Sequence, residues 1–167
     1  SIQGNILLGE DVLIQMQDNF INTDGTLGDK LMAAMQGANL AGADTRCLDD
    51  NISSLSSFIR VAKPNDILND IFLNLNVNNT FGQSEPIDSL QTLYNDWIIG
   101  HLSFEKGDIN QDQLIDLLDI IFIINFILNH IEFNVIEYYL ADCNNDNSIN
   151  IQDIIFIISL ILDLEIN

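Results

Sequence analysis

The chain has 167 residues, of which 47% are hydrophobic, and its formal net charge is -20 because only five residues are Lys or Arg. This apolar content excludes a disordered acidic tail, which lacks the side chains for a core. The scarcity of basic residues makes nucleic acid and anionic membrane surfaces poor partners. The carboxylates therefore serve either a soluble surface or the binding of cations.

Residues 1–100 form the first predicted domain, of mixed α and β character. Apolar residues at helical spacing predict one helix after Gly9 and a second after the turn at Asp24-Gly25. Pro86 occupies a favoured first helical position and predicts a last helix.

Two strands are expected between these helices. Residues 52–61 are rich in Ser and β-branched side chains, and residues 71–77 alternate between apolar and polar side chains. Together with the helices they predict an α+β domain. In the loop before the first strand, Asp44, Arg46 and Asp49 form either a loop ion pair, which we favour, or a small polar site.

Residues 101–106 are a plausible linker, and residues 107–167 form the second predicted domain. Gly107-Asp-Ile-Asn-Gln-Asp recurs 34 residues later as Ala141-Asp-Cys-Asn-Asn-Asp, and each copy leads into a strongly apolar helix. From Gly107 onward there are eleven Asp and Glu residues and no Lys or Arg. A compact helical segment of this charge repels itself, and divalent cations would relieve the repulsion.

Each repeat supplies oxygen donors at the spacing that calcium requires. Calcium prefers six to eight oxygen ligands, which a twelve-residue loop provides from positions 1, 3, 5, 7, 9 and 12. The predicted ligands are Asp108, Asn110, Asp112, the Leu114 carbonyl, Asp116 and Asp119 in the first loop, and Asp142, Asn144, Asp146, the Ser148 carbonyl, Asn150 and Asp153 in the second. A pair of Asx-rich turns that only cap two helices is the alternative.

The two loops are expected to be unequal. Position 6 needs a left-handed backbone, which Gly adopts freely. Here Gln113 and Asn147 occupy it, and Asn tolerates that conformation better than Gln. At position 8, Ile115 and Ile149 are expected to join the loops through a short backbone bridge.

The two repeats resemble those of type I dockerins. The resemblance implies two calcium ions, calcium-dependent folding, an exported protein and a cohesin-like partner. At loop positions 10 and 11, where dockerins often carry polar recognition residues, this chain has Leu117-Leu118 and Ile151-Gln152. Because its helices are apolar nearly all round, they must be covered by the N-terminal domain, by another copy or by a cohesin-like module.

The N-terminal half carries a second resemblance. Gln3-Gly-Asn-Ile-Leu, Ala43-Asp-Thr-Arg46 and Ser53-Ser-Leu are similar to the C-terminal half of a bacterial family called domain of unknown function ten-twenty-eight. This resemblance implies part of an N-terminal-nucleophile (Ntn) hydrolase-like sandwich of sheets between helices, with the first half of that domain missing. Ser1 lies inside the family pattern, so we do not expect it to be a catalytic nucleophile.

Other functional signals are weak. Cys47 and Cys143 form neither a disulfide framework nor a zinc site, although one bridge between them is possible. No paired acid and base, P-loop or dinucleotide fingerprint appears, and no apolar run is long enough for a membrane span. The sequence thus predicts an extracellular or cell-surface calcium-binding interaction or assembly module. The alternatives are a subunit of an extracellular filament or homopolymer, and a fragment of an Ntn-type amidohydrolase with a dockerin anchor.

Overall fold

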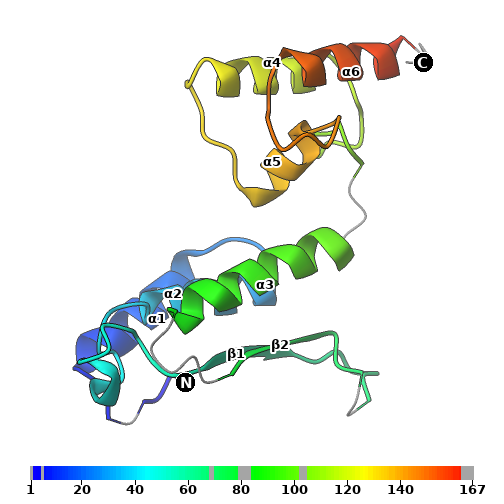
Figure 1. Cartoon of the computed structure of the whole chain (residues 1–167). Coiled ribbons are helices and arrows are strands. Elements are labelled where there is room, and N and C mark those ends of the chain that lie inside the picture. The colour runs from blue at the N-terminus through cyan, green and yellow to red at the C-terminus, as the bar shows by residue number, and fades with distance from the viewer. Residues whose placement is uncertain (1, 5, 68–69, 79–83, 102–104, 163–167) are drawn as a thin grey trace. The chain divides into compact units, whose positions relative to one another are not determined.

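The computed structural model (Figure 1) describes all residues except 1, 5, 68–69, 79–83, 102–104 and 163–167. The described residues form two compact units, residues 1–94 and residues 95–167. The boundary falls inside helix α3, Pro86–His101, which begins at the expected proline. Helix α3 thus includes His101, the first residue of the expected linker 101–106.

Two helices pack closely at the start of the first unit. They are α1, Glu10–Asn22, and α2, Leu27–Gly37, and both follow the predicted turns. A Cβ atom at Gly37 would lie 2.7 Å from the backbone of Gln15 and Met16. Only glycine therefore allows α2 to approach α1 so closely at this point.

A polar cluster fixes the start of α2 against α3. The Thr26 hydroxyl and backbone N–H both donate to the Asp29 carboxylate, and the Asp29 N–H donates to the Thr26 hydroxyl, which completes a capping box. The Tyr94 hydroxyl donates to the other Asp29 oxygen over 2.8 Å. Burial would raise the pKa of Asp29, but the hydrogen bonds from Thr26 and Tyr94 hold it below its usual value.

The two strands are shorter than the sequence predicts. β1, Ser57–Val61, pairs antiparallel with β2, Leu73–Val77. Residues 52–56 do not join β1, because the Ile52 and Ser53 carbonyls accept hydrogen bonds from the backbone N–H groups of residues 42 and 44. Ser53 also donates its N–H and hydroxyl to the Glu85 carboxylate. These contacts hold the segment away from β2.

The first unit is a layered α+β structure. Its helices lie over one face of the two-stranded sheet (Figure 1). Met32, Ile59, Leu73, Ile87 and Leu90 are buried between the layers. The α+β class is therefore confirmed, and the full Ntn-hydrolase-like sandwich stays a prediction.

The second unit is helical. It contains α4, Leu117–Ile127, α5, Val135–Ala141, and α6, Ile151–Ile161, of which α4 and α6 are the predicted apolar helices. One apolar core joins them to the starts of both loops, and it comprises Ile109, Ile120, Ile123, Leu140, Ala141, Cys143 and Ile157. No helix among the described residues is both long and apolar enough to cross a membrane.

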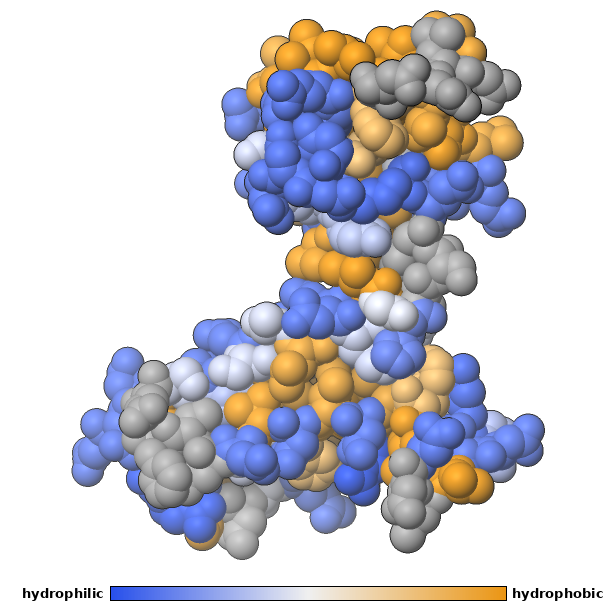
Figure 2. Space-filling model, turned by 45° about the vertical axis from the view of Figure 1, so that its right-hand side comes forward, coloured by the Kyte–Doolittle hydropathy of each residue, from blue (hydrophilic) through white to orange (hydrophobic). Residues whose placement is uncertain are grey.

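Much of the apolar surface of α4 and α6 remains uncovered within this unit. Leu117 and Ile151, at the starts of the two helices, are 65% and 67% exposed, and Ile155 is 57% exposed. Figure 2 shows hydrophobic surface gathered at the top of this unit, where Figure 1 draws α4 and α6, beside a hydrophilic surface. Only one side of each helix faces the core, so many of the apolar residues on the other sides are exposed within this unit.

Candidate metal centre

The predicted ligand residues lie in two loops, 108–119 and 142–153, that have the same internal geometry. In each loop the position 1 carboxylate accepts the backbone N–H groups of positions 5 and 6. The four distances are all 3.1 Å, from Asp112 and Gln113 to Asp108, and from Asp146 and Asn147 to Asp142. The first carboxylate of each loop is therefore held over the loop's own backbone.

The hydrogen bonds at positions 3 and 5 also correspond between the two loops. The side-chain oxygens of Asn110 and Asn144 each accept the N–H of position 5 over 2.9 Å. The carboxylate at position 5 accepts the N–H of position 7, over 2.9 Å in the first loop and 2.8 Å in the second. The side-chain oxygens at positions 1, 3 and 5, which are predicted metal ligands, thus have matching hydrogen bonds in the two loops.

Positions 9 and 12 connect each loop to its helix. Asp116 and Asn150 are the N-caps of α4 and α6, and each forms a reciprocal capping box with the Asp three residues later. The helix-capping role of these positions is therefore real. Helix capping explains the residue types at positions 9 and 12 only. It does not explain the oxygen-bearing side chains at positions 1, 3 and 5.

The aspartates at position 12 are the most deeply buried charged groups of the second unit. Asp119 and Asp153 are both fully buried, at 0% exposure. Asp119 accepts the N–H groups of residues 109, 110 and 116, and Asp153 accepts those of residues 143, 144 and 150, over 2.8–3.3 Å. These bonds compensate for part of the desolvation of the two carboxylates. The salt bridge found among the described residues is Arg46–Asp44, which lies in the other unit. No basic side chain of the described residues therefore forms a salt bridge with Asp119 or Asp153.

The backbone adopts the left-handed conformation at two positions of each loop. Gln113 and Asn147 at position 6 have φ angles of 72° and 62°, which confirms the prediction. Gln111 and Asn145 at position 4, with φ angles of 60° and 58°, share it and were missed by the sequence analysis. Asn145 offered a signal because Asn enters this region readily, whereas Gln111 offered none.

The expected backbone bridge between the loops is not formed. The isolated bridges among the described residues join Leu7 to Asp44 and residues 67 to 70. Ile115 and Ile149 at position 8 instead pack their side chains against the core of the second unit. The prediction failed because a shared apolar core can hold two loops without direct backbone pairing.

The donor chemistry of both loops fits calcium. Every predicted ligand atom is a carboxylate, amide or backbone oxygen, the type that this hard cation prefers. The side chains are engaged by backbone N–H groups, and in the described residues no three His, Cys, Asp or Glu side chains converge as a metal cluster. Cys143, beside Asp142, is buried and donates its thiol to the Leu140 carbonyl, and burial raises the pKa of that thiol to about 12.

Other candidate groups lie apart from the loops. Arg46 donates to both oxygens of Asp44, which confirms the loop ion pair, and this hydrogen bonding lowers the pKa of Asp44. Cys47 and Cys143 are both free and buried. Ser1 lies outside the described residues.

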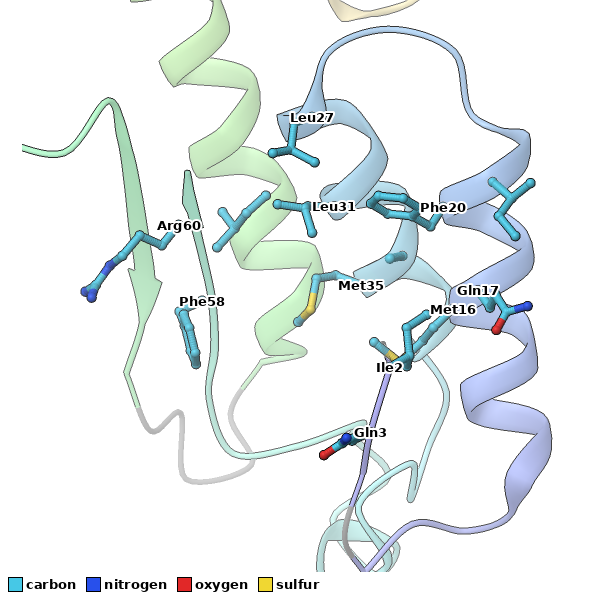
Figure 3. Close-up of a pocket in the computed structure, with 13 residues that line it drawn as sticks. Ile2, Gln3, Met16, Gln17, Phe20, Leu27, Leu31, Met35, Phe58 and Arg60 are labelled. Carbon is cyan, nitrogen blue, oxygen red and sulfur yellow. The ribbon is translucent and has the colours of Figure 1, made fainter. Parts of the chain in front are cut away.

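The first unit also contains an apolar cleft of about 700 Å³ between α1, α2 and β1 (Figure 3). Met16, Phe20, Leu31 and Met35 line it, and Arg60 is the one ionisable side chain among its described lining residues. These residues therefore provide no acid–base pair for hydrolysis within the cleft.

Comparison with known families gives one match within each of the two compact units. Residues 106–162 match the sequence model of the dockerin type I domain, and residues 1–90 match that of a family of unknown function, DUF1028. No curated protein and no solved structure matches the chain. Because the second match spans more than half of its residues, the chain belongs to the DUF1028 family, and it carries a dockerin type I domain at its C-terminal end.

Proposed function

We propose that the second unit binds two calcium ions, one in each loop, and that the ordered α4–α6 pair then docks on another protein module. A dockerin type I domain is a calcium-binding interaction module, so calcium and protein binding follow from the match. The two filled loops are supported by one observation above all. Side chains at positions 1, 3, 5, 9 and 12 make corresponding hydrogen bonds in both loops.

The ligands proposed for each ion are the loop oxygens at the six predicted positions. They are Asp108, Asn110, Asp112, the Leu114 carbonyl, Asp116 and Asp119 for one ion, and Asp142, Asn144, Asp146, the Ser148 carbonyl, Asn150 and Asp153 for the other. A bound calcium ion would supply the positive charge that residues 107–167, with eleven acidic and no basic residues, do not contain.

The chain prepares this binding through its own hydrogen bonds. Backbone N–H groups already orient the carboxylates of positions 1, 5 and 12, so little rotamer entropy remains to be lost when an ion binds. The buried carboxylates of Asp119 and Asp153 lie at the first turns of α4 and α6. Neutralising them would therefore stabilise the helices as well as the loops.

The docking face is proposed to be the exposed apolar surface of α4 and α6. Leu117 and Ile151, each more than 60% exposed, occupy loop position 10 in their repeats. Residues at such positions gain most from desolvation by a partner. A cohesin-like module is the partner that a dockerin domain implies, and we place the interaction on an exported, extracellular protein.

The same surface favours self-association as a second candidate function. Large contiguous apolar patches on a protein surface mark interaction sites, and a second copy could cover this one. In a filament or homopolymer, calcium in the loops would reduce the repulsion between strongly acidic copies. Light scattering separates the two candidates, since only self-association predicts a calcium-dependent rise in mass without any partner.

Calorimetric calcium titration of the full chain tests the main proposal. Asp112→Ala and Asp146→Ala each remove an exposed position 5 carboxylate from one loop. Asp18→Ala removes an equal charge from the exposed surface of α1 and serves as the matched control. We expect two ions for the wild type and the control, one for each loop variant and none for the double variant.

Two results would contradict the proposal. Absence of binding at millimolar calcium would refute it outright, because that range includes even weak extracellular calcium modules. Unchanged stoichiometry in both loop variants would show that calcium binds elsewhere on this acidic chain.

A further inference from the structure

The segments that enter the two loops are bonded to each other. Lys106, two residues before the first position of loop 108–119, donates its Nζ to the backbone carbonyl of Asp142 over 2.5 Å. Asp142 is the first residue of the other loop. Gly107, which follows Lys106 in the chain, donates its N–H to the Leu140 carbonyl over 3.0 Å. The start of one loop is therefore attached to the start of the other by a side-chain and a backbone hydrogen bond.

The Lys106 side chain is held at two points. Its ammonium lies 4.1 Å from the ring centroid of Tyr139, over the aromatic face. Tyr139 belongs to α5 and packs against the core of the second unit. Lys106 is also the single Lys or Arg of residues 95–167, yet it bonds a backbone carbonyl of a loop. Its place is thus defined by the loop entrance and by α5 together.

The joined segments carry the amides that close both loops. Ile109 donates its N–H to Asp119, and Cys143 donates its N–H to Asp153, with distances of 2.8 Å and 2.9 Å. The side chains of Ile109 and Cys143 are buried in the same core. Movement of either entry segment would therefore disturb a closing hydrogen bond in both loops.

We propose that Lys106 couples the two calcium loops, so that filling one loop raises the affinity of the other. The inference rests on the calcium function proposed above. Because Ile115 and Ile149 do not pair at position 8, the entry segments are the direct polar connection between the loops. A coupling of about tenfold lies within the usual range for interacting sites.

A thermodynamic cycle measures this coupling. Calorimetry gives the calcium affinity of loop 142–153 in the full chain and in Asp112→Ala, in which the other loop is disabled. The same pair is then measured with Lys106→Met, which removes the charge and the donor. Lys63→Met is the matched control, since Lys63 also lies over an aromatic ring, 3.4 Å from the centroid of Phe72 in the first unit.

We expect Asp112→Ala to weaken the second loop about tenfold in the wild type and in the Lys63→Met background. In Lys106→Met the two affinities should be nearly equal, and Lys106→Arg should restore the difference. As a second readout, disabling the first loop should accelerate hydrogen exchange at the Cys143 amide, which needs no Lys106 variant to fold.

The outcomes separate the two proposals. A wild type that binds no calcium ends the proposed function, and the coupling with it. Calcium binding with equal affinity of the second loop in wild type and Asp112→Ala overturns the coupling alone. A difference that survives Lys106→Met at full size shows that the coupling does not pass through Lys106.

Discussion

Replacing Gln113 with glycine is expected to stabilise loop 108–119, the first of the two proposed calcium loops. Gln113 has a φ angle of 72°, in the left-handed region. A side chain with a Cβ atom pays about 1–2 kcal/mol for this conformation, and glycine avoids that cost but loses about 0.5–1 kcal/mol more backbone entropy on folding. The net gain is thus at most about 1.5 kcal/mol, which corresponds to about a tenfold change in an equilibrium constant.

Hydrogen exchange in a fixed excess of calcium measures this gain locally. The Ile109 amide donates to the buried Asp119 carboxylate, so it exchanges only when the first loop opens. In Gln113→Gly this amide should exchange up to about ten times more slowly than in the wild type. The Cys143 amide reports the second loop in the same experiment.

Asn147→Gly is the matched variant in the second loop. Its φ angle of 62° is similar, but Asn tolerates this region, so the gain at Cys143 should be smaller. Equal gains in the two loops would contradict the reasoning from side-chain type. No slowing at Ile109 in Gln113→Gly would show that the first loop is not strained at position 6.

Two further predictions concern helix packing and pH. Gly37→Ala should destabilise the first unit by about 1–3 kcal/mol in chemical denaturation, because the new Cβ would lie 2.7 Å from the α1 backbone; Gly100→Ala, with no atom within 4 Å, should instead be neutral or stabilising, and equal losses would refute the packing argument. Asp29 has a folded pKa below its unfolded value, so its contribution to stability is present above the unfolded pKa near 4 and is lost as the pH falls through the folded pKa. Tyr94→Phe removes one of its donors and should reduce this acid-dependent loss in thermal melts, whereas Tyr138→Phe, whose hydroxyl bonds a carbonyl, should leave it unchanged.

The predictable part of this protein is local in the sequence. A calcium loop draws its oxygen ligands from one run of twelve residues, so the spacing of Asp and Asn alone predicts both loops. The left-handed backbone expected at Gln113 and Asn147 is present in the structure. Pro86 marked the start of α3 for the same reason, since its effect is on its own backbone.

The tertiary structure decided the features that depend on distant partners. Residues 52–56 have strand-like composition, yet two sets of hydrogen bonds hold Ile52 and Ser53 outside the sheet. The N–H groups of residues 42 and 44 donate to the carbonyls of Ile52 and Ser53, and the Ser53 N–H donates to the Glu85 carboxylate. Ile115 and Ile149 stand where a backbone bridge between the loops was expected, yet their side chains pack against the core of the second unit instead.

The contacts of Lys106 could not be predicted from the sequence. The sequence by itself showed that this residue is the last basic residue before a long acidic stretch, and it predicted that two calcium loops follow it. Only the folded chain brings its ammonium to the Asp142 carbonyl, 36 residues away, because α5 packs Tyr139 beneath it. Contacts of that range depend on how the helices pack, and no local pattern of residues encodes them.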